Sequence, residues 1–319
     1  MGKYFGQNGI RGVANETPMT PDAMTKFAMA VGLLHKNGGE HRLKAVVGKD
    51  TRLSSYMLEQ AITSGFLSAG VEVFLLGPVP TPGVAMLTRS LRADFGVMIT
   101  AADDLFEING LMIFDQDGMK ISEEAERGIE ALVDSDMQRR LAKGAALGSA
   151  KRIDGALERY VEAVKRTLPR EITFEGLRVV VDAANGAAYK AAPMALAELG
   201  AEVYPIGVEP NGSNINREVG ANAMLKTIFS VKEYRANFGM ALNGDGSRVV
   251  LVDERGIVIE DKDVSACMQG NCVSVDPEQE GRIILSDFTT TADGLIAALQ
   301  ILAVIKRTNK TASEVCRSN

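Results

Sequence analysis

The chain has 319 residues, which gives room for about two domains of ordinary size. Hydrophobic residues make up 46% and charged residues 24% of the sequence, which is typical of a globular protein and excludes a largely disordered chain. The formal net charge of −6 provides no overall positive field, so we expect neither nucleic acid nor an anionic membrane as a partner.

The N-terminal segment lacks the apolar core of a signal peptide, and no apolar run approaches the roughly 20 residues that span a bilayer. We therefore expect a cytoplasmic location and no membrane insertion. The three cysteines, Cys267, Cys272 and Cys316, are an odd number, which favours reduced thiols over a disulfide framework. No further Cys or His lies near Cys267 and Cys272 to complete a four-ligand metal site, so we expect no metal there.

Strands and helices alternate along the first 95 residues. Tyr4–Gly12 is interrupted by glycines, which predicts strand and loop rather than helix. Helices are predicted from the cap at Thr20 to about Leu34, from a cap at Ser54 or Ser55 to the stop at Gly70, and from Pro82 to about Leu91. The strands between them are predicted at Leu43–Val47 and Val71–Leu76. This order indicates a layered α/β domain.

Two apolar runs then flank a polar loop. Val97–Thr100 and Leu111–Phe114 are predicted to be buried strands. The loop that follows the first of them contains Ala101-Ala102-Asp103-Asp104. It has the position of a reactive loop, but its only candidate nucleophiles are two carboxylates.

The second half repeats the plan of the first. An acid-rich helix at Ser122–Leu132 and a polar stretch through Ala150 precede an amphipathic helix at Asp154–Thr167. Four strands are predicted after it, at Leu177–Val181, Ala201–Ile206, Phe238–Leu242 and Val249–Val252. We predict domains at 1–150, 151–256 and 257–319. The strongly apolar helix predicted at Asp293–Lys306 packs either on the short third unit or in an interface.

Three segments together resemble the phosphohexose mutases, and the phosphoglucosamine mutases in particular. They are the opening Tyr4–Gly12, the loop Thr100–Leu105 followed by Ile108-Asn109-Gly110, and the loop Asn243-Gly244-Asp245-Gly246-Ser247-Arg248. The resemblance implies layered α/β/α domains of the phosphohexomutase type. Two of these domains are complete, the third is shortened, and the family's final domain is absent.

The same resemblance exposes two departures from the family. The family's phosphate-carrying serine falls on Ala102, and the histidine beside it falls on Asp103. The three aspartates that hold magnesium in the family fall on Asn243, Asp245 and Ser247, so only one carboxylate is retained. Because a hard cation needs charged oxygen donors, the resemblance predicts a lost magnesium site and no cofactor. The leading interpretation is a catalytically inactive scaffold or regulatory protein that binds a protein partner, itself or an active mutase.

Two alternatives stay open. The first is a non-catalytic sugar-phosphate sensor, whose candidate binding residues are Arg11, Lys49, Arg52, Arg248, Glu278 and Gln279. For Arg11 a surface ion pair, and for Lys49 and Arg52 a solvated turn, explains the residue equally well. The second alternative is a residual phosphohexose mutase or phosphotransferase, in which Asp103, Asp104 or Thr100 accepts the phosphoryl group.

Overall fold

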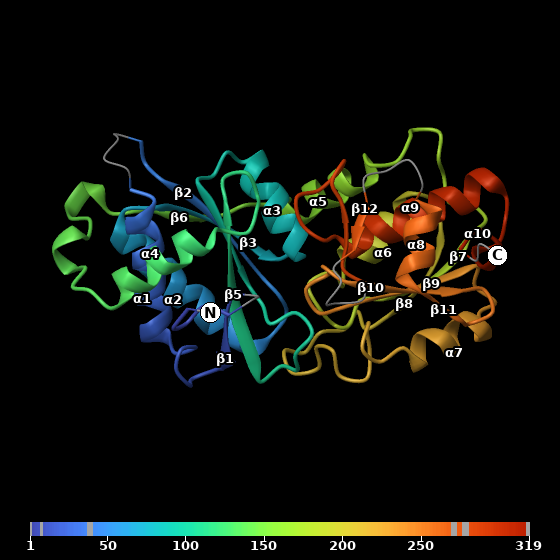
Figure 1. Ribbon diagram of the computed structural model, residues 1–319, viewed down its shortest axis with the longest axis horizontal. Coiled ribbons are helices and arrows are strands. Elements are labelled where there is room, and N and C mark those ends of the chain that lie inside the picture. Colours follow the sequence, from blue (N-terminus) through green and yellow to red (C-terminus); the bar gives the residue numbers. More distant parts are fainter. Residues whose placement is uncertain (1, 7–8, 37–40, 269–272, 276–280, 317–319) are drawn as a thin grey trace.

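The structure is a computed structural model that describes residues 2–6, 9–36, 41–268, 273–275 and 281–316. Two α/β bodies lie side by side along the long axis of the molecule (Figure 1). The first half of the chain forms one body, and the second half, including the C-terminal helices, forms the other. Among the described residues, no helix combines the length and the apolar character needed to cross a bilayer.

The first body is built on a six-stranded sheet. Its strands, in spatial order, are β1 (Ile10–Val13), β5 (Ile108–Asp115), β4 (Phe95–Ile99), β2 (Lys44–Lys49), β3 (Glu72–Pro78) and β6 (Ala150–Arg152). The strands β4, β2, β3 and β6 run parallel, and β5 and β1 extend the sheet in antiparallel pairing. Ala45 and Val47 face one core, whereas Val46 between them faces the other, as the two-residue period of a strand requires. The sheet is therefore covered on both faces.

The helices of the first body are α1 (Pro21–Leu34), α2 (Leu53–Ala69), α3 (Thr81–Ser90) and α4 (Glu123–Val133), with short 3-10 turns at Gln138–Arg140 and Gly144–Ala146. The Thr20 side chain caps α1, and Gly70, with φ of 87°, ends α2, as predicted. The predicted cap at Ser54 or Ser55 is wrong, because α2 begins at Leu53 without a side-chain cap. Both serine hydroxyls instead accept hydrogen bonds from the Asn109 amide, at 2.8 and 3.0 Å.

The second body is built on a five-stranded sheet. Its strands, in spatial order, are β11 (Val258–Ile259), β10 (Val249–Asp253), β9 (Phe238–Leu242), β7 (Arg178–Asp182) and β8 (Glu202–Ile206). The helix α7 (Leu225–Glu233) covers one face, while α5 (Ala156–Lys165) and α6 (Ala191–Glu198) contribute to the core on the other. The sequence did not predict α7.

The third unit is small and has no large sheet among its described residues. It consists of α8 (Asp261–Cys267), the hairpin β12 (Val273–Val275) and β13 (Ile283–Leu285), α9 (Gly294–Thr308) and α10 (Ala312–Val315). Nearly all of α9 is buried, in one core with α5, α6 and strands of the second sheet. Of the two placements predicted for this helix, the structure therefore shows burial within the chain.

Candidate functional site

A buried arginine holds the loop that follows β4. Arg52 has no exposed side-chain surface, and its Nε donates to Asp50 Oδ2 at 2.8 Å. Its two terminal nitrogens donate to four carbonyl groups of the loop, those of Ala102, Asp104, Leu105 and Ile108. Arg52 was predicted as an anion-binding residue, but here its side chain bonds to Asp50 and to the carbonyl groups of the loop. Its direct contact with a sugar phosphate stays a prediction.

The second body contacts backbone carbonyl groups of the same loop. Asn216 Nδ2 donates to the carbonyl oxygens of Ala102 at 2.7 Å and of Asp104 at 2.8 Å. A Cβ atom at Gly244 would lie 2.7 Å from the Ala102 carbonyl oxygen, so glycine permits the close approach of the two loops. The loop at 100–105 and the loop at 243–248 therefore form one site.

Ala102 occupies the position where the family resemblance places a serine. Its φ is 46°, and its amide donates to Thr100 Oγ1 at 3.0 Å. The Thr100 hydroxyl in turn donates to Asp50 Oδ2 at 2.8 Å, and only 3% of Thr100 is exposed. Thr100 is thus engaged as donor and acceptor within the frame of the loop, away from solvent.

Asp103 reaches from the first body toward the second. Its Oδ1 accepts a hydrogen bond from Arg248 Nη1 at 3.1 Å, and its Oδ2 lies 3.4 Å from Asn243 Nδ2. The side chains of Asp103 and Arg248 are 29% and 17% exposed, so the pair stays open to solvent on one side. Arg248 Nη1 also donates to Asn222 Oδ1 at 2.6 Å. The structure thus brings together three residues that the sequence singled out separately.

Asp104 points to a different partner. Its Oδ2 accepts a hydrogen bond from Arg11 Nη1 at 2.8 Å, and both side chains are about one-third exposed. The Arg11 Nε atom is buried and has no hydrogen-bond partner in the structure. Lys49, another predicted binding residue, is buried and donates to Glu59 at 2.8 Å, with its ammonium 3.9 Å from the centre of the Tyr56 ring. Glu278 and Gln279 lie outside the described residues.

The loop after β9 carries a fully buried carboxylate. Asp245 Oδ2 accepts the Thr81 hydroxyl at 2.6 Å, and its Oδ1 accepts the Ser247 hydroxyl at 2.7 Å and the Ser247 amide at 3.1 Å. Asn243 Oδ1 accepts the Arg248 amide at 3.1 Å. The three positions that the resemblance assigned to magnesium therefore present a carboxylate, an amide oxygen and a hydroxyl oxygen.

These atoms can be tested for their fit to magnesium. Mg²⁺ is commonly bound through one or two carboxylates together with waters and substrate phosphates. Asp245 provides one carboxylate with about four acceptor positions, of which three are used, and Asp103 provides a second from the facing loop. The carboxylate and hydroxyl oxygens suit a hard cation, whereas the Asn243 amide turns its nitrogen toward Asp103 and its oxygen toward the Arg248 amide. Among the described residues, no three Asp, Glu, His or Cys side chains cluster as metal ligands, so a magnesium ion here would take its remaining ligands from water or a substrate phosphate.

Sequence reasoning missed Thr81, Asn216 and Asn222 as parts of this site. Asn216 ends a turn-rich stretch that packing alone seemed to explain, and its own φ is 58°. Thr81 lies in the first body, 164 residues before its partner Asp245. Only the folded chain brings such residues to the loops.

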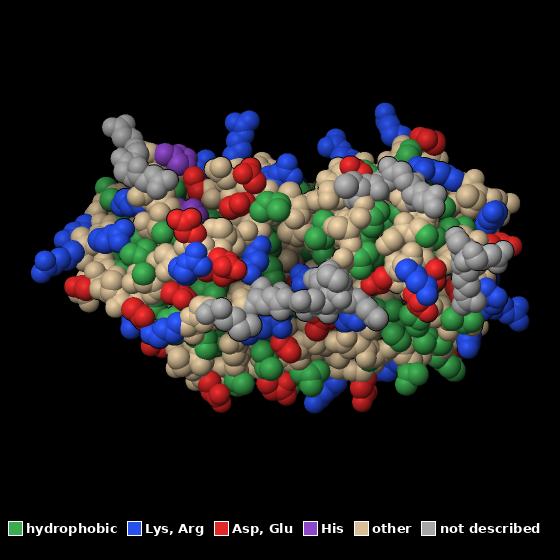
Figure 2. Space-filling view, in the orientation of Figure 1, with side chains coloured by type: hydrophobic (Ala, Val, Ile, Leu, Met, Phe, Trp, Pro, Cys, Tyr) green, Lys and Arg blue, Asp and Glu red, His purple; other side chains and the backbone are tan. Residues whose placement is uncertain are grey.

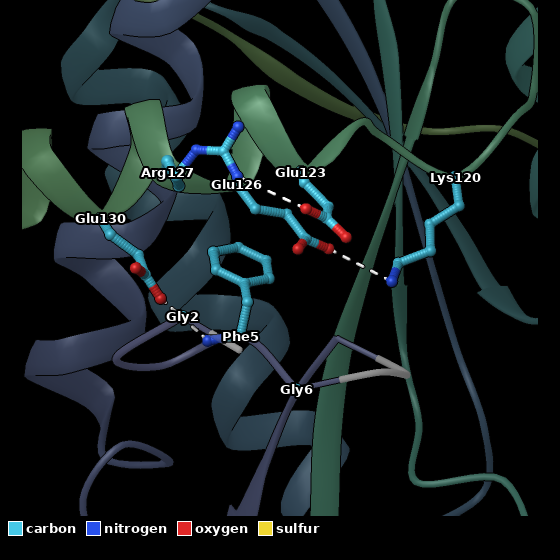
Figure 3. Close-up of a pocket in the computed structure, with 8 residues that line it drawn as sticks. All are labelled: Gly2, Phe5, Gly6, Lys120, Glu123, Glu126, Arg127 and Glu130. Atoms are coloured by element: carbon cyan, nitrogen blue, oxygen red, sulfur yellow. Dashed lines mark hydrogen bonds and ion pairs between the residues drawn. The ribbon is translucent and has the colours of Figure 1, made fainter.

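A separate pocket of about 380 Å³ lies between the N-terminal segment and α4 (Figure 3). Its charged side chains pair with one another, Lys120 with Glu126 at 3.2 Å and Arg127 with Glu123 at 3.4 Å. Glu130 accepts backbone amides of the N-terminal segment. The pocket shares no lining residue with the two loops, so it is not part of the site described above.

Comparison of the sequence with known proteins identifies its family. Residues 2–140, 158–256 and 261–319 match α/β/α domains I, II and III of phosphoglucomutase/phosphomannomutase. The chain belongs to this family. Phosphoglucosamine mutase of Sinorhizobium medicae is 50% identical over 99% of this chain and 81% of its own length, and that of Agrobacterium fabrum is 48% identical over the same shares. The predicted family resemblance is confirmed.

Solved structures confirm the predicted fold class. A putative phosphomannomutase from Thermus thermophilus superimposes with a TM-score of 0.83, at 24% identity, over 98% of this chain and 82% of its own. A family protein from Burkholderia thailandensis gives 0.81 at 22% identity, over 98% and 78%. The alignment with the Sinorhizobium mutase spans 365 positions, more than the 319 residues here, so that relative has internal residues that this chain lacks. This agrees with a shortened third domain, while the exact domain limits stay predictions.

Two functional predictions need correction. The predicted inactive scaffold, with its protein-binding role, is wrong, because relatives about half identical over nearly the whole chain are phosphoglucosamine mutases. That prediction judged activity from two loops alone. The prediction of no cofactor is contradicted by a solved relative. An N-acetylphosphoglucosamine mutase from Aspergillus fumigatus, with a TM-score of 0.58 at 11% identity over 98% of this chain and 78% of its own, was solved with GlcNAc-6P and magnesium. That prediction counted carboxylates only within one loop and omitted Asp103.

Proposed function

We propose that this chain binds a hexosamine phosphate and transfers a phosphoryl group, with the Asp103 carboxylate as acceptor in place of a serine hydroxyl. The observation that carries the proposal is that Asp103, on the loop at 100–105, faces the loop at 243–248, 3.1 Å from Arg248 Nη1 and 3.4 Å from Asn243 Nδ2. The 50% identity to a phosphoglucosamine mutase over 99% of this chain supports the substrate class.

The proposed step is a phosphoryl transfer from a hexosamine bisphosphate. An Asp103 carboxylate oxygen attacks phosphorus, the bond from phosphorus to the sugar oxygen breaks, and that oxygen takes a proton from water. The resulting aspartyl phosphate then passes its phosphoryl group to a hydroxyl of a sugar monophosphate, which releases a proton and restores the carboxylate. Arg248 lies where it can balance charge on the phosphoryl oxygens, and bound magnesium would spread that charge further.

The other two acceptors considered from the sequence are less suited. The Thr100 hydroxyl is buried and is bonded to Asp50, so phosphorylation there would break the frame of the loop. The Asp104 carboxylate is paired with Arg11. The Asp104 carbonyl oxygen accepts hydrogen bonds from Arg52 and Asn216. Asp103 alone of the three faces the loop at 243–248.

The test is labelling with hexosamine 1,6-bisphosphate that carries radioactive phosphate, followed by denaturing electrophoresis. We expect a labelled chain whose label hydroxylamine removes, because an acyl phosphate is cleaved by hydroxylamine and a phosphoserine is not. Asp103→Asn should lose the label, whereas the matched variant Asp104→Asn should keep it. Label that resists hydroxylamine, or that persists in Asp103→Asn, would contradict the proposal.

Conversion of glucosamine 6-phosphate to glucosamine 1-phosphate, followed by phosphorus NMR, provides the second readout. We expect turnover that requires added magnesium and disappears in Asp103→Asn. Cytoplasmic location and self-association stay predictions, to be checked by cell fractionation and by native mass measurement.

A second candidate function is a sugar-phosphate sensor that binds without turnover. The methyl group of Ala102, which cannot carry phosphate, favours it. For a sensor, calorimetry with glucosamine 6-phosphate would show binding in the native chain and in Asp103→Asn alike, while the labelling experiment would stay blank. The two experiments together therefore separate the two candidates.

A further inference from the structure

Two thiols from separate helices meet in the third unit. Cys267 is the last residue of α8, and Cys316 follows the end of α10. The Cys267 thiol donates to the carbonyl oxygen of Val315, directly before Cys316, at a sulfur–oxygen distance of 3.1 Å. Both are free cysteines in this structure. Figure 1 shows α8, α9 and α10 gathered at the same end of the second body.

The position of Cys316 is fixed by the short helix before it. Thr311 and Glu314 form a capping box at the start of α10. The Ser313 amide and hydroxyl donate to the two Glu254 carboxylate oxygens, at 3.1 and 2.5 Å, which ties α10 to the turn after β10. The Cys316 amide donates to the Ala312 carbonyl at 2.9 Å. The thiol is therefore held opposite α8 by bonds that do not involve sulfur.

The surroundings of the two thiols differ. Cys267 is partly exposed, and the hydrogen bond from Cys316 lowers the pKa of its thiol. Cys316 is 1% exposed, and the bond with Cys267 together with burial raises the pKa of its thiol. A thiolate, not a thiol, is the nucleophile toward an oxidant. One sulfur is thus partly accessible, and the other is buried directly after the residue that the first contacts.

We propose that Cys267 and Cys316 are a modification site that forms a reversible disulfide when a peroxide is supplied. The Cys267 thiolate attacks a peroxide oxygen, the O–O bond breaks, and sulfenic acid and water result after protonation. The Cys316 sulfur then attacks the sulfenic sulfur, the S–O bond breaks, and a second water leaves. Two thiols are oxidised and hydrogen peroxide is reduced to two waters. The resting state stays reduced, as the odd cysteine count predicts.

The disulfide would close the third unit on itself. It joins α8 to α10 and encloses α9, whose first amide, that of Gly294, donates to the Gly246 carbonyl at 3.1 Å. Because a cross-link restricts the unfolded chain, we expect the oxidised protein to unfold at a midpoint roughly 5 °C higher. The proposal does not depend on the proposed phosphoryl transfer.

The experiment uses the full chain, treated with a small excess of hydrogen peroxide, alkylated and digested without reductant. We expect a cross-linked pair of peptides that contain Cys267 and Cys316, lighter by two hydrogens than the reduced pair and separated by dithiothreitol. Cys272→Ser is the matched control and should give the same pair, because Cys272 is not one of the two linked residues. Cys316→Ser should lose both the pair and the rise in midpoint.

The Cys272→Ser variant also keeps the proposal falsifiable if Cys316→Ser folds poorly. In that variant only the two proposed partners remain, so a disulfide within one chain can join no other residues. Over-oxidation of Cys267 without any cross-link in Cys272→Ser, or a link between Cys267 and Cys272 as the main product of the native chain, would overturn the proposal.

Discussion

The two sides of the loop at 100–105 differ in what holds them. On the inner side, Arg52 and Asn216 donate to backbone carbonyl groups, and both residues are buried. On the outer side, Asp103 contacts Arg248 through partly exposed side chains. Backbone-directed bonds do not depend on which side chain the loop carries, so the frame tolerates alanine at position 102. We therefore expect the outer side to decide the chemistry of the loop.

Removing the inner support should have the largest effect. Arg52→Ala leaves the buried Asp50 carboxylate without its cation and releases the four loop carbonyls. Loss of one partner of a buried pair costs about 3–5 kcal/mol. We expect a decrease of that size in the free energy of unfolding, measured by urea denaturation.

The control for that experiment is Arg11, a partly exposed arginine on β1 that pairs with Asp104 of the same loop. Arg11→Ala removes a pair whose side chains are both about one-third exposed, and such pairs contribute about 1 kcal/mol or less. Equal losses of stability in the two variants would break the distinction between inner and outer sides.

The next effect concerns a buried carboxylate in the third unit. Asp293 caps α9, is fully buried, and accepts the Tyr160 hydroxyl at 3.1 and 3.0 Å. Burial raises the pKa of Asp293 to about 6. Because the folded pKa lies above the unfolded one, the native state binds the extra proton. This contribution to stability is complete below pH 4 and is lost as the pH rises through 6.

Asp293→Asn keeps a side-chain cap and removes the titration. Relative to the native chain, we expect this variant to gain roughly 3 kcal/mol between pH 4 and pH 7, measured as the difference in urea unfolding. A flat difference for Asp293→Asn across that range would show that Asp293 does not titrate between the two states.

The sequence predicted the longer strands of the two large sheets and the positions of the two loops, but not the short strands β6, β11, β12 and β13. Phe238–Leu242 was placed to the residue, because a continuous apolar run between turns is typical of a buried strand. The helix α7 was missed because its large side chains Leu225 and Phe229 are 82% and 65% exposed, so they do not mark a buried face.

The role of Arg52 could not be predicted from local sequence. An arginine in Gly48-Lys49-Asp50-Thr51-Arg52 is typical of an anion-binding turn, and its neighbours along the chain do not bury it. Burial comes from a loop about 50 residues later that folds over the guanidinium. A long separation in sequence also explains why the Asp103–Arg248 contact emerged only from the structure, because these residues are 145 positions apart.

Restoring a serine tests whether the inner frame is still intact. Ala102→Ser adds a hydroxyl at a nearly buried position with positive φ, which we expect to cost about 1 kcal/mol of stability. If the frame alone positions the loop, the variant should acquire a phosphate label that resists hydroxylamine. The native chain should carry only the phosphate label that hydroxylamine removes. Absence of the stable label in a folded Ala102→Ser would show that the frame no longer positions a serine.

The smallest effect is expected where the two loops face each other. Asn243→Asp replaces the amide that lies 3.4 Å from Asp103 Oδ2 with a second carboxylate. Without magnesium the like charges repel, and we expect a loss of about 1 kcal/mol or less because the site is partly solvated. Magnesium should restore that stability, because the added charge improves the ligand set around Asp245.

Asn222→Asp is the matched control for this change. It adds the same charge, but next to Arg248 Nη1, to which Asn222 Oδ1 lies 2.6 Å away. Its stability should therefore rise slightly without magnesium and respond little when magnesium is added at constant ionic strength. If magnesium stabilises both variants equally, the ion is screening charge in general. If it stabilises only Asn243→Asp, the outer side of the site binds the cation through Asp103, position 243 and Asp245 together.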